Sequence, residues 1–355
     1  MTYLKELILK DQVFLVLAIT IAVSLVLVVL FAIYTIFLRL RNIRKARYWR
    51  RLELLWEPAV LNILTGESTY GAVRELVGHH ESVFFIDYCQ RFAQRLSGEE
   101  ADIIRRLIEP YLPALAQRVQ KGDPPQRARA VRTLSMLGFE QYHEVIEAAL
   151  DDPSPLVAMI AARALSQRGS PECIAAVMER LHRFGNWSQS YLASMLTTVG
   201  PKATPVLRYT LLDPQKDARV RTVAADALRA LNDLEAGDPV TAVLTEETDR
   251  DLTAAILRLL GKVGRPEHLQ NVRPLVKSDD FVVRAQALRV LGELGGASEL
   301  EILKRGLEDE SPWTTIQAAR GLREAGGENL LRELAARDHP RSELARQVLA
   351  EGSVA

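Results

Sequence analysis

The sequence predicts an all-α protein in which a single transmembrane helix is followed by an α-solenoid, a stack of helical hairpins. Three observations lead to this prediction. Residues 13–38 carry no charge, residues 39–51 carry seven positive charges and no negative one, and residues 123–340 repeat with a period of 31 or 32 residues. An uncharged stretch with a basic flank is typical of a membrane span, and a period of this length is typical of a helical repeat array.

The uncharged stretch, residues 13–38, is long enough to cross a bilayer. Its 26 residues would form a helix of about 39 Å, against about 30 Å for the hydrocarbon core. A cleavable signal peptide is the alternative, but its apolar region is normally about 7–15 residues long and follows positive charge. Here the apolar stretch is longer and the positive charge lies on its far side. A buried core helix is also disfavoured, because cores seldom need 26 residues that are apolar all round.

The seven basic residues that follow the span predict its orientation. We call them the collar: Arg39, Arg41, Arg44, Lys45, Arg47, Arg50 and Arg51. Positive residues next to a span stay in the cytoplasm, whereas residues 1–12 contain two basic and two acidic residues. We therefore expect a single-pass protein of the plasma (inner) membrane, with the N-terminus outside and the C-terminal domain cytoplasmic. The collar would also contact anionic lipid headgroups.

Three aromatic residues lie in or just after the collar: Tyr48, Trp49 and Trp56. Such residues can lie at the membrane interface or pack on a neighbouring helix, and the sequence leaves both open.

The part of the chain after the collar is acidic. Residues 52–355 contain 36 basic and 43 acidic residues, which argues against a nucleic acid as partner. The two cysteines, Cys89 and Cys173, cannot build a disulfide framework and lack the spacing of a metal site.

The repeat is visible at the ends of seven predicted helices. Each of these opening helices ends in Gly or Asn, at Gly138, Gly169, Gly200, Asn232, Gly264, Gly295 and Gly326. A leucine stands four residues earlier every time, at Leu134, Leu165, Leu196, Leu228, Leu260, Leu291 and Leu322. Eight residues earlier stand Ala130, Ala161, Leu192, Ala224, Ile256, Ala287 and Ala318. Positions four and eight apart share one helix face, so the pattern predicts an amphipathic helix with its leucine in the core.

Each opening helix is expected to end in a left-handed C-cap, because Gly and Asn adopt that conformation most readily. A second helix follows in each unit, as in SPECIAAVMERL at 170–181. Acidic residues such as Asp152 and Asp280 end the units and can cap the next helix.

The units at 151–181 and 279–307 resemble bacterial HEAT-like repeats, the short form also found in phycobilin lyases. Their pattern is D-x-x-x-V-R-x-x-A-x-x-A-L-x-x-L-G, which Asp279, Val283, Arg284, Ala287 and the run from Leu291 to Gly295 follow. The units at 182–213 and 249–278 depart from it, so an Asp–Arg ladder from unit to unit is in doubt. The resemblance implies binding and scaffolding more often than catalysis.

The expected organisation has six parts. These are a short extracytoplasmic N-terminus (1–12), the span (13–38), the collar (39–51), a divergent helical capping region (52–122), a HEAT-like solenoid of about seven units (123–340), and a C-terminal cap helix with its tail (341–355).

No motif for catalysis is present. The sequence lacks a G-x-S-x-G elbow, a phosphate-binding G-x-x-x-x-G-K-[ST] loop and a dinucleotide fingerprint. Of six histidines only His79 and His80 are close, and adjacent residues point about 100° apart on a helix. We therefore expect no catalytic residues, no cofactor and no metal, and a protein that is not an enzyme.

Two tryptophans are the candidate partner-binding residues. Trp187 and Trp313 both lie thirteen residues before the Gly that ends their unit, in the first turn of the opening helix. Arg219 and Asp251 occupy this position in other units, so it should be partly exposed. Each Trp is then either an anchor for a partner or a cover over a gap between units.

These features predict a membrane-tethered scaffold whose cytoplasmic solenoid binds another, membrane-associated protein. The layout resembles accessory subunits of membrane-embedded enzymes such as polysaccharide-synthesising glycosyltransferases. Two alternatives remain: an enzyme of the HEAT-like chromophore lyase type, and a membrane-surface sensor that binds anionic lipid through the collar.

Overall fold

The computed structural model of the protein describes residues 2–93, 96–138 and 140–352. Every regular element in these residues is a helix. The chain divides into two compact units, residues 1–114 and 115–355, and the boundary falls inside helix α5.

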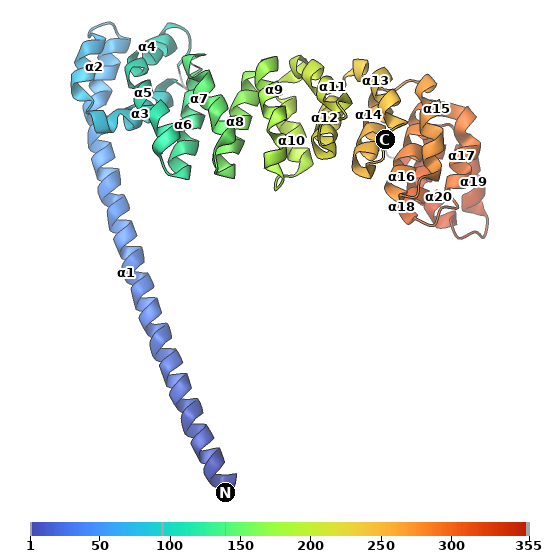
Figure 1. Ribbon diagram of the computed structural model, residues 1–355, viewed down its shortest axis with the longest axis horizontal. Coiled ribbons are helices and arrows are strands. Elements are labelled where there is room, and N and C mark those ends of the chain that lie inside the picture. The colour runs from blue at the N-terminus through green and yellow to red at the C-terminus, as the bar shows by residue number, and fades with distance from the viewer. Residues whose placement is uncertain (1, 94–95, 139, 353–355) are drawn as a thin grey trace. The chain divides into compact units, whose positions relative to one another are not determined.

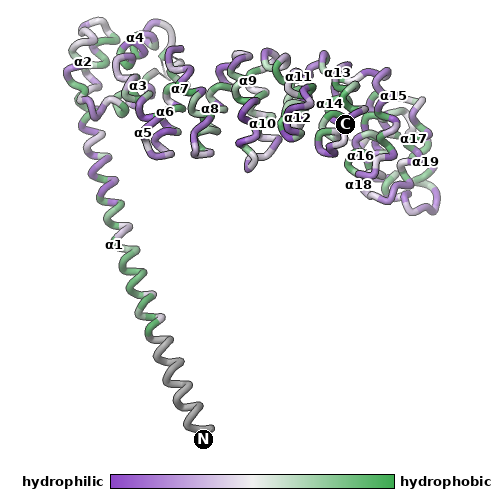
Figure 2. The backbone as a smooth tube through the Cα atoms, in the orientation of Figure 1, coloured by the Kyte–Doolittle hydropathy of each residue, from purple (hydrophilic) through white to green (hydrophobic). Residues whose placement is uncertain are grey.

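The first unit is built on one uninterrupted helix, α1 (Thr2–Leu64) (Figure 1). This helix contains the predicted span (residues 13–38), the collar and the first helix expected for the capping region. Figure 2 shows its hydrophobic stretch giving way to hydrophilic residues toward α2. The other elements of this unit are α2 (Tyr70–Leu76), η1 (His79–Glu81), α3 (Ser82–Ala93), α4 (Glu99–Ile108) and η2 (Glu109–Tyr111).

The core of the first unit forms around Trp56 of α1. This side chain is fully buried and packs against the rings of Phe84, Phe85 and Tyr88 of α3. Of the two roles that the sequence left open, membrane interface or helix packing, Trp56 therefore has the second. Tyr48 is half-exposed and donates a hydrogen bond to Glu81.

The second unit is a succession of helical hairpins (Figure 1). It begins within α5 (Leu112–Lys121). The opening helices are α6 (Pro124–Leu137), α8 (Pro155–Arg168), α10 (Gln189–Thr197), α12 (Ala218–Leu231), α14 (Arg250–Val263), α16 (Phe281–Gly295) and α18 (Pro312–Glu324). The second helices are α7 (His143–Ala148), α9 (Pro171–Glu179), α11 (Thr204–Leu212), α13 (Gly237–Leu244), α15 (Leu269–Val272), α17 (Leu300–Gly306) and α19 (Glu328–Ala336), and α20 (Ser342–Gly352) packs on α18 and α19.

Short 3-10 helices connect many of these elements: η3 (Glu140–Tyr142), η4 (Ala149–Asp151), η5 (Leu181–Phe184), η6 (Gly200–Ala203), η7 (Leu234–Ala236), η8 (Pro266–His268), η9 (Arg273–Lys277) and η10 (Gly296–Glu299).

The core of the second unit is the stripe predicted from the repeat. The seven leucines from Leu134 to Leu322 are all buried, and so are the seven residues four positions before them. Consecutive opening helices pack directly on one another. Helices α16 and α18 approach each other closely at Gly292 and Gly321, where a Cβ on Gly292 would overlap the backbone of Gly321.

The predicted left-handed C-cap forms at five of the seven positions, with φ between 55° and 83°. The prediction is wrong at Gly264 and Gly295. Gly264 is extended, with φ −73° and ψ 171°, and a Cβ there would come within 2.8 Å of Leu294. At Gly295 the helix runs one residue further, and Gly296 takes the positive φ of 58° instead.

Candidate functional site

The two tryptophans chosen from the sequence take related but unequal positions. Trp313 is the second residue of α18 and its side chain is 48% exposed. Trp187 lies before α10 rather than in its first turn, which corrects the prediction. The reason is Ser188, whose side chain accepts a hydrogen bond from the backbone N–H of Tyr191 at 3.2 Å and caps the helix there.

Trp187 is fixed by its neighbours. Its ring stacks on Tyr191, with ring centroids 5.2 Å apart. Its backbone carbonyl accepts a hydrogen bond from Arg219 in the next opening helix. The ring is only partly exposed. Trp187 therefore has features of both predicted roles: it takes part in contacts between units, as a cover would, and it leaves part of its ring accessible to a partner, as an anchor would.

Other apolar side chains are exposed at the same ends of the opening helices. Together with the two tryptophans we call them the ridge: Leu156, Trp187, Tyr191, Phe281 and Trp313. Successive helix starts are linked, since Thr314 donates a hydrogen bond to the carbonyl of Phe281 at 3.2 Å. Arg219 and Asp251 separate the ridge into two apolar clusters.

Sequence reasoning missed three members of the ridge. Leu156 occupies the same repeat position as the tryptophans, but a leucine in an apolar helix gives no sign of exposure. Phe281 is one position earlier and Tyr191 four positions later than the tryptophan position of their units. A search for large apolar residues across the first turn of each opening helix would have found them.

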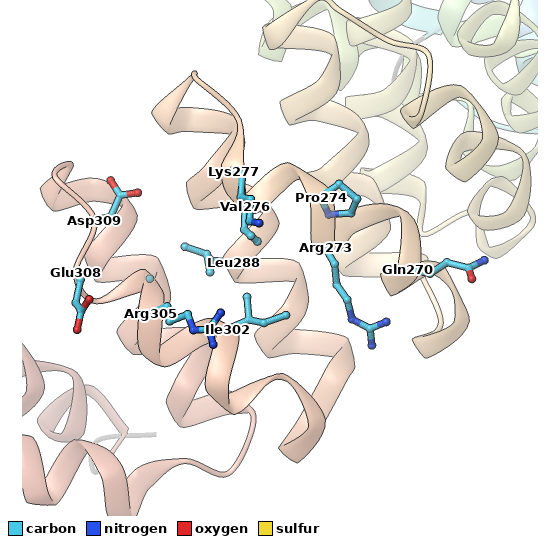
Figure 3. Close-up of a pocket in the computed structure, with 11 residues that line it drawn as sticks. Gln270, Arg273, Pro274, Val276, Lys277, Leu288, Ile302, Arg305, Glu308 and Asp309 are labelled. Carbon is cyan, nitrogen blue, oxygen red and sulfur yellow. The ribbon is translucent and has the colours of Figure 1, made fainter.

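A groove of about 690 Å³ lies between the second helices of two consecutive units (Figure 3). One wall is the last part of the α15–η9 segment, the other is α17, and Leu288 of α16 lies between them. Pro274 explains why the groove opens here. Proline cannot continue an α-helix with full hydrogen bonding, and α15 spans only four residues before the chain tightens into η9.

The groove has an apolar floor and basic side chains around it. Val276, Leu288 and Ile302 supply apolar surface, while Arg273, Lys277 and Arg305 supply positive charge (Figure 3). Nothing in the sequence marked these residues, because they come from three helices and their charges look like those of any solvated helix face.

The seven collar residues are all exposed on α1. Successive residues of a helix point about 100° apart, so these seven side chains spread over roughly two thirds of the helix circumference instead of forming one narrow basic face. Lys45 also lies over the ring of Trp49, 5.3 Å from its centroid. So broad a distribution suits contacts with surrounding headgroups better than contacts with a single protein surface.

The cysteines and histidines form no recognisable reactive centre in the described part of the chain. Cys89 is fully buried, and burial raises its thiol pKa far above the ordinary value. Cys173 is also buried; it accepts a hydrogen bond from Ser170 at 3.1 Å and its Sγ lies 3.9 Å from His143 Nε2. No group of three or more His, Cys, Asp or Glu side chains is arranged to hold a metal among the described residues.

By length and composition, one helix of the described residues can cross a membrane: α1, from Ile19 onward. None of its most hydrophobic 18-residue window is buried. Side chains such as Leu25, Val28 and Phe31 are more than half exposed, so this stretch is not a core helix of the described fold.

Comparison with known families assigns the repeats. A family model for HEAT repeats matches residues 112–187 and 237–323. The chain contains HEAT repeats. The unmatched residues 188–236 continue the same alternation of opening and second helices, from α10 to α12. HEAT repeats stack into an α-solenoid, and such arrays provide long surfaces suited to binding other proteins.

Several solved structures are distantly similar to this chain. The complex of CpcE and CpcF of phycocyanin lyase from Nostoc sp. PCC7120 is 20% identical, with a TM-score of 0.32, over 68% of this chain and 87% of that one. Human deoxyhypusine hydroxylase in complex with glycerol is 20% identical, with a TM-score of 0.30, over 71% and 96%. An engineered protein is 17% identical, with a TM-score of 0.38, over 82% and 97%. No curated protein matches the chain.

Proposed function

We propose that this protein is a single-pass membrane scaffold whose HEAT repeats bind a second, membrane-associated protein in the cytoplasm and hold it at the bilayer. The observation that carries the proposal is the continuity of α1. One helix without a break contains an exposed apolar stretch, the basic collar and the buried Trp56 that anchors it in the folded capping region.

The collar supports the proposed orientation. Seven positive charges directly after the apolar stretch favour retention of that side in the cytoplasm. A rigid helical connection would keep the folded part close to the bilayer. Confinement to the same membrane raises the effective concentration of scaffold and partner, and this strengthens binding without any additional contact.

The ridge is the surface that we propose for the partner. Its aromatic residues are rich in contact area, and partly exposed Trp and Tyr side chains are the commonest anchors of protein interfaces. As the partner we favour a membrane-embedded biosynthetic enzyme, such as a polysaccharide-synthesising glycosyltransferase. The tether raises the effective concentration only of a partner that shares the bilayer.

The experiment is co-purification of the full chain, tagged after Ala355, from membranes in mild detergent. We expect one integral membrane protein in stoichiometric amount, and at least tenfold weaker binding of that protein by Trp313→Ala. Leu234→Ala is the matched control, since Leu234 is 68% exposed but follows the opposite end of an opening helix. Equal binding by wild type and Trp313→Ala would reject the ridge, and recovery without any membrane protein would reject the scaffold.

We propose a binding role and no catalysis of its own. The alternative of a chromophore lyase is tested by the absorption spectrum of the protein purified from cells that make tetrapyrroles. We expect no visible absorption, whereas a stoichiometric bound pigment would favour the lyase.

A further inference from the structure

We propose that the groove between the α15–η9 segment and α17 binds an extended peptide segment of the partner in which acidic and aliphatic side chains alternate. The inference rests on the proposed scaffold function and names the chemistry of what the scaffold holds. It follows from the charges around the groove, the apolar surface within it, and the position of the groove beside the ridge.

Some charged side chains of the groove form ion pairs and others do not. Arg273 is neutralised by Glu299, to which its Nε and one Nη donate at 3.2 and 2.6 Å. Asp309 is neutralised in the same way by Arg284. Lys277 and Arg305 are exposed, and neither forms an ion pair with any acidic side chain of the described residues. Glu308 is the only acid of the lining without such a partner there, so positive charge is in excess.

This local excess is opposed to the charge of the rest of the folded chain. Residues 52–355 carry seven more acidic than basic residues. A basic groove in an acidic body selects for ligands with a local negative charge, because a generally anionic surface is repelled elsewhere. An anionic membrane surface fits this distribution poorly.

The apolar residues define the rest of the ligand. Val276, Leu288 and Ile302 lie between the basic side chains, with Arg305 one helical turn from Ile302 (Figure 3). Side chains of an extended peptide alternate in direction. A segment of alternating type can therefore place aliphatic side chains on this floor while carboxylates of the same segment meet Arg305 and Lys277. Arg273 adds a preorganised donor, since its ion pair with the buried Glu299 fixes its position.

Two residues of the groove lining also stand close in the chain to members of the ridge. Phe281 follows Lys277 by four residues, and Trp313 follows Asp309 by four. A peptide that leaves the groove beside these residues reaches the second apolar cluster of the ridge directly. The two candidate surfaces then act as one interface.

The test uses the full chain in an uncharged detergent and a fluorescein-labelled, amidated peptide of alternating glutamate and leucine. Fluorescence anisotropy measures binding, with empty micelles as the blank and a peptide of alternating glutamine and leucine as the neutral control. We expect saturable binding of the acidic peptide that weakens with added salt, and at least about tenfold weaker binding of the neutral peptide.

Variants decide whether the binding is in the groove. Arg305→Glu should weaken the acidic peptide at least about tenfold, and Ile302→Ala should weaken it several-fold without changing the salt dependence. The matched control is Lys304→Glu, which makes the same charge change on an exposed neighbour in α17 outside the groove. Because Arg305 has no ion pair to lose, its variant should keep the wild-type circular dichroism.

Four results would overturn the proposal: no saturable binding, equal binding of the neutral peptide, an equal loss in Lys304→Glu, or an Arg305-dependent displacement of the peptide by phosphatidylglycerol vesicles. The last would assign the groove to lipid headgroups. If a membrane partner co-purifies equally well with wild type and Arg305→Glu, the groove proposal fails while the scaffold proposal stands. Failure of the scaffold would instead appear as the absence of any partner from both.

Discussion

Arg284 of α16 donates two hydrogen bonds to the carboxylate of Asp309, at 2.7 and 2.9 Å, and so joins one HEAT repeat to the acidic loop that enters the next. The same Arg donates to the backbone carbonyls of Ser278 and Asp279 at 2.9 and 3.0 Å. One side chain therefore holds the loops on both sides of its helix.

The relationship recurs wherever the arginine of the repeat pattern is present. Arg127 binds both carboxylate oxygens of Asp152 at 2.8 Å, and Arg221 binds Glu247 at 2.8 Å. We call these three pairs the ladder. It has gaps, because the corresponding positions of other units hold residues such as Gln189 and Thr253, which carry no charge.

The ladder predicts a selective loss of stability. Replacing Arg284 by Ala leaves Asp309, whose side chain is 15% exposed, without its cationic partner. We expect a loss of about 1.5–3 kcal/mol in the free energy of unfolding, the usual range for a hydrogen-bonded charge that is largely buried. Denaturant unfolding followed by circular dichroism measures it. The control Arg289→Ala removes an exposed pair with Glu293 in the same helix and should cost less than about 0.5 kcal/mol; equal losses would contradict the assignment.

The same pair predicts a dependence on pH. The hydrogen bond from Arg284 holds the pKa of Asp309 below its usual range. The carboxylate therefore stabilises the fold at pH values above the unfolded pKa of about 3.9, and this contribution disappears as the pH falls through the folded pKa. The difference in unfolding free energy between wild type and Arg284→Ala should be constant from pH 7 to 5 and shrink below pH 4. A difference that grew on acidification would show that the sign is wrong.

The leucine stripe predicts which part of the array loosens first. Leu228 is fully buried in α12, which packs on α10, α11 and α14. Leu228→Ala should cost about 2–5 kcal/mol, and hydrogen exchange should rise first in the middle units because each repeat contacts only its neighbours. Unchanged thermal unfolding would mean that the repeat register is wrong.

The two tryptophans should differ in what they do for stability. Trp313 is half-exposed and forms no aromatic pair among the described residues, whereas Trp187 stacks on Tyr191 and its backbone is bound by Arg219. Trp187→Ala should lower the melting temperature by several degrees, and Trp313→Ala should lower it less. A larger loss in Trp313→Ala would favour a cover between units at that position and weaken the case for the ridge.

Most of the fold could be predicted from the sequence because its determinants are local and repeated. The leucines, their partners four residues earlier and the capping residues recur in each unit. The two wrong caps arose from different causes. A Cβ at Gly264 would overlap the backbone carbonyl of Leu260 and the side chain of Leu294 from the next opening helix, and sequence spacing describes neither contact. At Gly295 the adjacent Gly296 gave the helix a later place to end.

The candidate site was only partly predictable for a related reason. Trp187 and Trp313 are found by register, but the exposure of Leu156 and Phe281 depends on which neighbours cover them. The groove could not be found at all from periodicity, since it results from Pro274 interrupting one second helix and from side chains of three helices meeting in space. The ladder was doubted from sequence because the units at 182–213 and 249–278 depart from the repeat pattern. Four of the seven units lack its arginine, yet an ion pair forms in each of the three units that have it.

The central claim is that α1 tethers cytoplasmic HEAT repeats to a membrane, and protease protection tests it most directly. An epitope fused after Ala355 is followed during protease treatment of intact bacterial spheroplasts and of permeabilised ones. In a separate assay, membranes are washed with carbonate to test whether the epitope remains in the membrane fraction. We predict that the epitope stays in the washed membrane fraction, is protected in intact spheroplasts and is cleaved after permeabilisation. Cleavage in intact spheroplasts, or release of the epitope into the soluble fraction, would contradict the account.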